Sequence, residues 1–224
     1  HVLGLEVDNP AALAAAESEL KKNGIPVSRG AEEGCKARRV MDYITFEDPT
    51  GNKFDLVVRP IDSNRRCFPT RDAGITEFSH VGLRTTNPAR DEIFWTTLFN
   101  VHSNDWIGPA PLLSFDSVHH RFALFPADAP GIQHVNFQVA SIDDVMRSHY
   151  FLTSHQVRIV FGPGRHVTSG ATFLYFEGPD GVVYEYSHGV KLIDDPNYRP
   201  RQFDFTPESF CAWGAKPDIP EFHE

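Results

Sequence analysis

The chain repeats one arrangement of apolar and polar positions. The segments HVLGLEV, from His1, and HVNFQVA, from His134, alternate apolar with polar residues in a pattern typical of a half-buried strand. A helix-capping signal and a helical pattern follow each strand. The expected caps are Asn9-Pro10 in the first copy and Ser141 with Asp144 in the second, and the expected helices span residues 11–23 and 143–153. A further strand is predicted near residues 26–27 and 157–160, followed by a loop.

Each copy closes with a predicted hairpin. The segment ITFEDPTGNKFDLVV, from Ile44, matches FLYFEGPDGVVYEYS, from Phe173. A looser third copy lies between them, with the strand FSHVGLRTT, a cap at Asn87-Pro88, the helix DEIFWTTLF and the strand HHRFALFP. The repeated unit is therefore βαβββ. Three tandem units predict an α+β protein whose sheets curl into open half-barrels, because one such sheet cannot bury its concave face alone.

Two domains are expected from the spacing of these units. Residues from about 59 to 76 contain Pro60 and Pro69, several arginines and no periodicity, and are typical of a linker. We therefore expect an N-terminal scaffold domain of one module over residues 1–72 and a C-terminal catalytic domain of two modules plus a tail over residues 73–224. The tail is Pro-rich and then aromatic, and we expect it to fold over the second domain or a neighbouring subunit.

Composition narrows the choice of partner. The 224 residues carry 30 acidic against 21 basic side chains, a formal charge of −9, and no block of Lys or Arg. This balance argues against a nucleic-acid or anionic membrane surface, and no apolar run approaches the roughly 18 residues of a membrane span. A small molecule and another copy of the chain, forming a homo-oligomer, are the expected partners. Cys35, Cys67 and Cys211 form no CxxC pair, so we expect free thiols in a cytoplasmic protein.

Position within the repeat selects candidate metal ligands from the eleven histidines. His80 and His134 each precede the apolar first strand of successive units, and Glu185 lies on the last strand of the final unit. Two imidazoles and one carboxylate with open positions suit non-haem Fe(II) and O₂ chemistry, and Mn(II) accepts the same ligands. In the first unit the equivalent positions hold His1 and Asp55 without a third partner, so we expect a scaffold copy without metal.

The final hairpin predicts a phenol beside the candidate carboxylate. If Gly178-Pro179-Asp180-Gly181 forms the turn, Tyr175 lies opposite Glu185 on one face of the sheet. A register slip of one residue would send the two side chains to opposite faces.

These residues resemble the type I extradiol catechol dioxygenases of the vicinal oxygen chelate superfamily. The resemblance covers nearly the whole chain and is strongest over residues 78–189, above all in GPGRHVTSGATFLYFEGPDGVVYEYS from Gly162. It implies Fe(II) ligands, an acid–base histidine and substrate-contacting groups. The implied ligands are His80, His134 and Glu185. The implied catalytic residues are His120 as the acid–base histidine, with His119 less favoured, Tyr175 as a stabiliser or acceptor of the substrate proton, and His166. The implied substrate contacts are His166, Tyr175, Thr168 and His119. Thr168 departs from the family pattern, since several relatives carry Asn there.

The resemblance also implies the reaction. A catechol-type substrate and O₂ would bind the metal, both oxygen atoms would enter the ring-cleaved product, and no organic cofactor is needed. Substrates with a biphenyl-diol, a substituted or a carboxylated ring stay open, and Arg121, Arg165 and His119 are candidates for holding a carboxylate. A glyoxalase-type metal isomerase or lyase and a non-catalytic small-molecule binding protein are the alternatives.

The number of modules in this chain predicts one more module before it. Two-domain members of this family have four modules, so we expect a preceding module of roughly 60 to 75 residues. A shortened enzyme whose first unit pairs with another subunit is the alternative.

Overall fold

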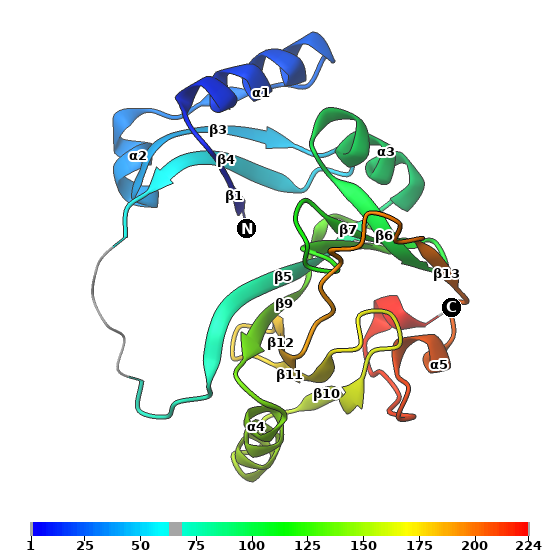
Figure 1. The fold of residues 1–224 in the computed structure, drawn as a ribbon. Coiled ribbons are helices and arrows are strands. Elements are labelled where there is room, and N and C mark those ends of the chain that lie inside the picture. The colour runs from blue at the N-terminus through cyan, green and yellow to red at the C-terminus, as the bar shows by residue number, and fades with distance from the viewer. Residues whose placement is uncertain (1, 63–68, 224) are drawn as a thin grey trace. The chain divides into compact units, whose positions relative to one another are not determined.

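The computed structural model describes residues 2–62 and 69–223, which divide into two compact units, His1–Phe68 and Pro69–Glu224. The boundary expected after residue 72 lies near this division, and the assignment of the units as domains stays a prediction. Figure 1 shows the helices and strands of both units.

The N-terminal unit holds one βαβββ module with an additional short helix. Its elements are β1 (Leu3–Val7), α1 (Pro10–Lys22), β2 (Ser28–Arg29), α2 (Glu32–Arg38), β3 (Val40–Glu47) and β4 (Lys53–Pro60), with the sheet order β1-β4-β3-β2. The Asn9 side chain accepts a hydrogen bond from the amide of Ala12 and caps α1, as its position predicts. Helix α2 lies where the sequence predicts a loop. Its acidic first turn and basic last turn favour a helix, but its seven residues are too few to show a periodic pattern.

The C-terminal unit holds two further modules in one nine-stranded sheet. The first comprises β5 (Ile75–Thr85), α3 (Pro88–Leu98), β6 (His102–Ile107), β7 (Ala110–Ser114) and β8 (Phe122–Pro126); the second comprises β9 (Gly131–Val139), α4 (Ile142–Ser154), β10 (Ile159–Arg165), β11 (Thr172–Glu177) and β12 (Val183–His188). The sheet order is β10-β11-β12-β9-β5-β8-β7-β6-β13. In all three modules the first strand pairs in parallel with the fourth. The predicted α+β fold of tandem βαβββ modules is confirmed.

Alternation along the strands gives this sheet two different faces. On β11, Leu174 packs with Val145 of α4, whereas Phe173 and Tyr175 point to the opposite face. The C-terminal segment covers that opposite face. It contributes β13 (Arg201–Phe203), which pairs in parallel with β6, and then α5 (Pro207–Phe210) and the 3₁₀ turn η1 (Pro220–Phe222). Figure 1 shows this segment lying within the curve of the sheet. The tail therefore folds over its own unit, one of the two arrangements expected from sequence.

Two other expectations concern thiols and membranes. Cys35 and Cys211 are free, and Cys67 lies outside the described residues. Within residues 2–62 and 69–223 there is no helix with the length and apolar character needed to cross a membrane.

Candidate metal centre

Three neighbouring strands bring the candidate ligands to one face of the sheet. His134 lies on β9, which has β5 on one side and β12 on the other. The residues opposite His134 are Gly82 on β5 and Val183 on β12. His80 and Glu185 each lie two residues from those positions. Because side chains alternate with a period of two, all three point to the same face.

The donor atoms have the spacing of a metal site. His80 Nε2 lies 2.9 Å from His134 Nε2, and Glu185 Oε2 lies 3.1 Å from His80 Nε2 and 3.4 Å from His134 Nε2. Adjacent corners of an octahedron stand about 3 Å apart when each metal–donor bond is about 2.1 Å long. The three atoms therefore fit one face of an octahedron, which leaves the opposite face for other ligands. Among the described residues, this is the one group of three such side chains close enough to share an ion.

The buried carboxylate and imidazole groups of the cluster also indicate a site for a cation. Glu185 is fully buried, and its Oε2 has no hydrogen-bond partner within the described part of the chain although two imidazole nitrogens lie beside it. An unsatisfied buried carboxylate oxygen costs free energy, and a metal ion would satisfy it. Burial lowers the pKa of His80 to about 4, so this imidazole is neutral. Burial acts to raise the pKa of Glu185, but the surrounding imidazoles hold it well below its usual range. A neutral imidazole and an ionised carboxylate are the forms that bind metals.

Two residues that the sequence analysis did not select support His134. The Oε1 atom of buried Gln133 makes a short hydrogen bond with His134 Nδ1, which orients the ring and leaves Nε2 free to bind a metal. Gly82 leaves the space that the ring occupies, because a Cβ at this position would lie 2.3 Å from His134 Nδ1. Neither residue has a chemical signature in a single sequence.

Tyr175 and His166 form a hydrogen-bonded pair beside the carboxylate. Tyr175 lies directly opposite Glu185, so the predicted register is confirmed. His166 Nδ1 donates to the carbonyl of Phe210, at 3.0 Å, and its Nε2 lies 3.2 Å from the Tyr175 hydroxyl oxygen. His166 Nε2 also lies 3.3 Å from Glu185 Oε1. Burial, reinforced by Glu185, raises the pKa of Tyr175 well above its usual value, so the phenol keeps its proton.

The adjacent histidines His119 and His120 occupy different environments. His120 lines the pocket, with its ring centroid 4.2 Å from that of His80, whereas His119 is fully buried behind it. Both nitrogens of His119 are occupied, Nε2 by Asp105 and Nδ1 by His120. His119 therefore does not line the pocket. Burial lowers the pKa of both imidazoles, although Asp105 acts in the opposite direction on His119.

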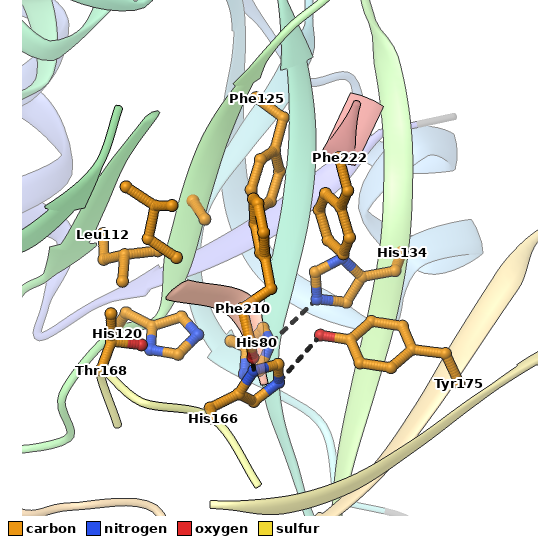
Figure 2. Close-up of a pocket in the computed structure, with 12 residues that line it drawn as sticks. His80, Leu112, His120, Phe125, His134, His166, Thr168, Tyr175, Phe210 and Phe222 are labelled. Atoms are coloured by element: carbon orange, nitrogen blue, oxygen red, sulfur yellow. Dashed lines mark hydrogen bonds between the residues drawn. The ribbon is translucent and has the colours of Figure 1, made fainter. Parts of the chain in front are cut away.

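The pocket around the cluster is small and mostly apolar. It has about 20 Å³ of space, enough for little more than one water molecule. Figure 2 shows His80, His120, His134, His166 and Tyr175 directed into it, with aromatic rings of the C-terminal segment alongside. Besides these five residues the lining comprises Ile107, Leu112, Ala123, Phe125, Thr168, Phe210 and Phe222.

The arginines considered as carboxylate binders do not line this pocket. Arg121 pairs with Asp116, and Arg165 donates to the carbonyl of Gly170. In the N-terminal unit, Asp55 binds Arg38 and Thr45, and His1 lies outside the described residues.

The sequence of this chain is similar to a protein family and to several enzymes of known name. Residues 77–186 match the model of the Glyoxalase/Bleomycin resistance protein/Dioxygenase superfamily. The chain is 26% identical to an iron-dependent extradiol dioxygenase of Rhodococcus jostii (strain RHA1), over 90% of this chain and 74% of that protein. It is 27% identical to a biphenyl-2,3-diol 1,2-dioxygenase of Pseudomonas sp. (strain KKS102), over 85% of this chain and 71% of that protein.

Solved structures share the fold over the whole chain. A halotolerant catechol dioxygenase superposes with a TM-score of 0.88 at 20% identity, covering 99% of this chain and 76% of that one. A Mn(II)-bound glyoxalase from Novosphingobium aromaticivorans superposes with a TM-score of 0.84 at 25% identity, covering 100% and 74%. The segment that carries the His80–His134–Glu185 cluster is therefore a domain of the Glyoxalase/Bleomycin resistance protein/Dioxygenase superfamily.

Proposed function

We propose that the protein is an extradiol dioxygenase, which cleaves a catechol-type ring beside its two hydroxyl groups and inserts both atoms of O₂. The observation that carries the proposal is the triangle of His80, His134 and Glu185 donor atoms, 2.9 to 3.4 Å apart, at the wall of an apolar pocket. The sequence similarity to enzymes named extradiol dioxygenases supports it.

The cluster would hold Fe(II), with Mn(II) as the alternative that the same ligands accept. When bound, the ion would supply Lewis-acid activation of the diol hydroxyls and open coordination positions for the diol and O₂. The ligand residues contribute one negative charge, from Glu185, so the charge of a divalent ion is only partly neutralised. The remaining positive charge of the site would favour binding of the catechol as an anion over binding of the neutral diol.

Tyr175 and His166 are proposed to remove a proton from the substrate. With Glu185 bound to a metal ion, His166 Nε2 would accept the hydrogen bond of the Tyr175 hydroxyl, so the Tyr175 oxygen could accept a substrate proton while it passes its own to His166. The two residues stand on the Glu185 side of the pocket, within 3.3 Å of that carboxylate through His166. Thr168, also in the lining, is proposed to contact the ring.

His120 is proposed to act on the oxygen side of the reaction. It lies against His80 and has a ring nitrogen free to face the pocket, because its Nδ1 is bound to His119. A neutral imidazole in this position can hold a proton and return it when the O–O bond breaks.

The lining favours an uncharged ring substituent. Beyond the metal-ligand cluster and its neighbouring polar groups, the pocket wall is made by aliphatic and aromatic side chains, and no arginine or lysine of the described residues takes part. A carboxylate on the ring would lose its hydration there without a compensating cation. We therefore propose alkyl- or aryl-substituted catechols rather than carboxylated ones.

Anaerobic reconstitution tests the proposal. The protein is loaded with Fe(II) or with Mn(II), mixed with catechol, 3-methylcatechol, 2,3-dihydroxybiphenyl or 3,4-dihydroxybenzoate, and exposed to O₂. We expect O₂ uptake and a yellow ring-cleaved product with the uncharged catechols, weaker turnover of the carboxylate, and no activity in His134→Ala. Absence of O₂ uptake with every catechol, or wild-type activity of His134→Ala, would contradict the proposal.

A further inference from the structure

A chain of three buried side chains leads away from the pocket behind His120. His120 Nδ1 lies 3.0 Å from His119 Nδ1, and His119 Nε2 lies 2.9 Å from Asp105 Oδ2. Asp105 and His119 are fully buried, and His120 is nearly so. The three residues come from β6 and from the segment that precedes β8, so the folded unit brings them together from different parts of the chain.

Hydrogen-bond chemistry gives this chain a direction. A carboxylate only accepts, so His119 must donate from Nε2 to Asp105. Neutral His119 then has a bare Nδ1 and can only accept there, so His120 must donate from Nδ1. Neutral His120 is thereby left with a bare Nε2, and no described residue binds that atom.

We propose that Asp105 and His119 are positioning residues that fix His120 as the Nδ1–H tautomer, with the lone pair of Nε2 directed to the pocket. The inference deepens the proposed function, on which the role of His120 in turnover rests. In this tautomer His120 meets the substrate or O₂ as a proton acceptor. A proton that it takes up is balanced by the Asp105 carboxylate at the far end of the chain.

The direction of the hydrogen bonds from Asp105 to His120 depends on which atom of residue 105 faces His119, and the other contacts of Asp105 determine this atom. Oδ1 accepts from three donors, the Tyr198 hydroxyl at 3.0 Å and the Arg201 amide and Nε at 2.8 and 3.2 Å. Oδ2 accepts from His119 and from the Arg201 guanidinium. In Asp105→Asn the amide oxygen is therefore held on the Oδ1 side, and its NH₂ group faces His119. His119 would then accept at Nε2 and donate from Nδ1, which makes His120 the Nε2–H tautomer.

Nitrogen NMR measures the tautomer without any turnover. The full chain is labelled with ¹⁵N-histidine and loaded with Zn(II), which is diamagnetic and binds the same imidazole and carboxylate ligands. In the wild type we expect a protonated Nδ1 and an unprotonated Nε2 for His120, and in Asp105→Asn the reverse. Tyr198→Phe is the matched control, since it removes a hydrogen bond from the same carboxylate but leaves the chain to His119 intact; it should retain the wild-type tautomer.

Kinetics with Fe(II) provide the second readout. We expect kcat of Asp105→Asn to fall by about 10² or more with KM for the catechol unchanged, because a wrong histidine tautomer impairs proton transfer rather than binding. Three results would overturn the inference: a protonated Nε2 in wild-type His120, an unchanged tautomer in Asp105→Asn, or a reversed tautomer in Tyr198→Phe. If Asp105→Asn does not fold, the wild-type spectrum still decides. The spectra are independent of dioxygenase activity, so failure of the proposed function is seen separately in O₂ uptake.

Discussion

Replacing Gly82 by alanine should weaken metal binding while leaving the fold intact. The added Cβ would lie 2.3 Å from His134 Nδ1 and 2.7 Å from Gln133 Oε1. Ordinary van der Waals contact begins at about 3.4 Å, so the imidazole must retreat by about 1 Å. Metal–donor distances tolerate only about 0.2 Å, so this displacement removes one of three protein ligands. We expect the metal dissociation constant to rise by about 10- to 100-fold, equivalent to about 1.4 to 2.8 kcal/mol.

Gly4→Ala is the matched control for this experiment. Gly4 lies on β1, the first strand of its own module as β5 is of the second, and a Cβ there would meet no atom within 4 Å. Alanine in an unstrained strand position stabilises a protein by about 0.4 to 1 kcal/mol through the unfolded state. Gly4→Ala should therefore match or slightly exceed wild-type thermal stability and bind metal normally.

The measurement is an anaerobic competition titration of Fe(II) between the protein and a chromophoric chelator. We expect weak Fe(II) binding for Gly82→Ala alone, with similar circular dichroism spectra for the wild type and both variants. Wild-type affinity in Gly82→Ala would refute the view that Gly82 provides the space for His134.

Three further predictions concern other parts of the site. Tyr175→Phe should lower kcat by about 10² with metal affinity unchanged, because it removes the proton path to His166. Tyr184→Phe alters a half-buried phenol on β12 that does not line the pocket, and it should behave as wild type in O₂ uptake. Burial acts to raise the pKa of Asp105, but hydrogen bonds from its neighbours outweigh burial and lower the pKa to about 2. The ionised carboxylate therefore stabilises the folded state above about pH 4, and this contribution to the free energy of unfolding is lost as the pH falls towards 2. Urea titrations should thus show the wild type losing about 1 kcal/mol relative to Asp105→Asn between pH 5 and pH 3, and an equal slope in both proteins would contradict the assignment. Phe222→Ala should enlarge the pocket of about 20 Å³ and lower KM for aryl-substituted catechols. It should also lower the free energy of unfolding in urea by about 3 to 5 kcal/mol, because Phe222 is buried. An unchanged preference between methyl- and aryl-substituted catechols would show that Phe222 does not limit the pocket.

The fold could be predicted from sequence because the information repeats. Each module carries its own cap, helix and hairpin, and Asn9, Asn87 and Ser141 all cap helices where the sequence places them. The tight turn after β11 fixes the hairpin register, so the pairing of Tyr175 with Glu185 followed from counting residues. Strand order between modules does not follow in this way, because it depends on how the faces pack after the modules form.

The supporting residues of the site could not be predicted because their chemistry is ordinary until the chain folds. Gln133 is one polar residue in an alternating strand, and Gly82 is one glycine among sixteen. Asp105 is 14 residues from His119 and has no motif around it. Their functions arise from atomic contacts across strands, and a single sequence contains no record of those contacts.

The C-terminal segment shows why the edge of a predicted domain can belong to its active site. The sequence indicated only that an aromatic tail folds back, yet the tail contributes residues to two parts of the site. Phe210 and Phe222 line the pocket, and the carbonyl of Phe210 orients the His166 ring by accepting from its Nδ1. Further along the sheet, β13 pairs with β6 so that Arg201 lies opposite Asp105 and holds that carboxylate. The same segment thus supplies a partner to each of the two histidines proposed to move protons, on the Tyr175 side and on the His120 side of the pocket. A change in its packing would alter both hydrogen-bond systems without touching a metal ligand.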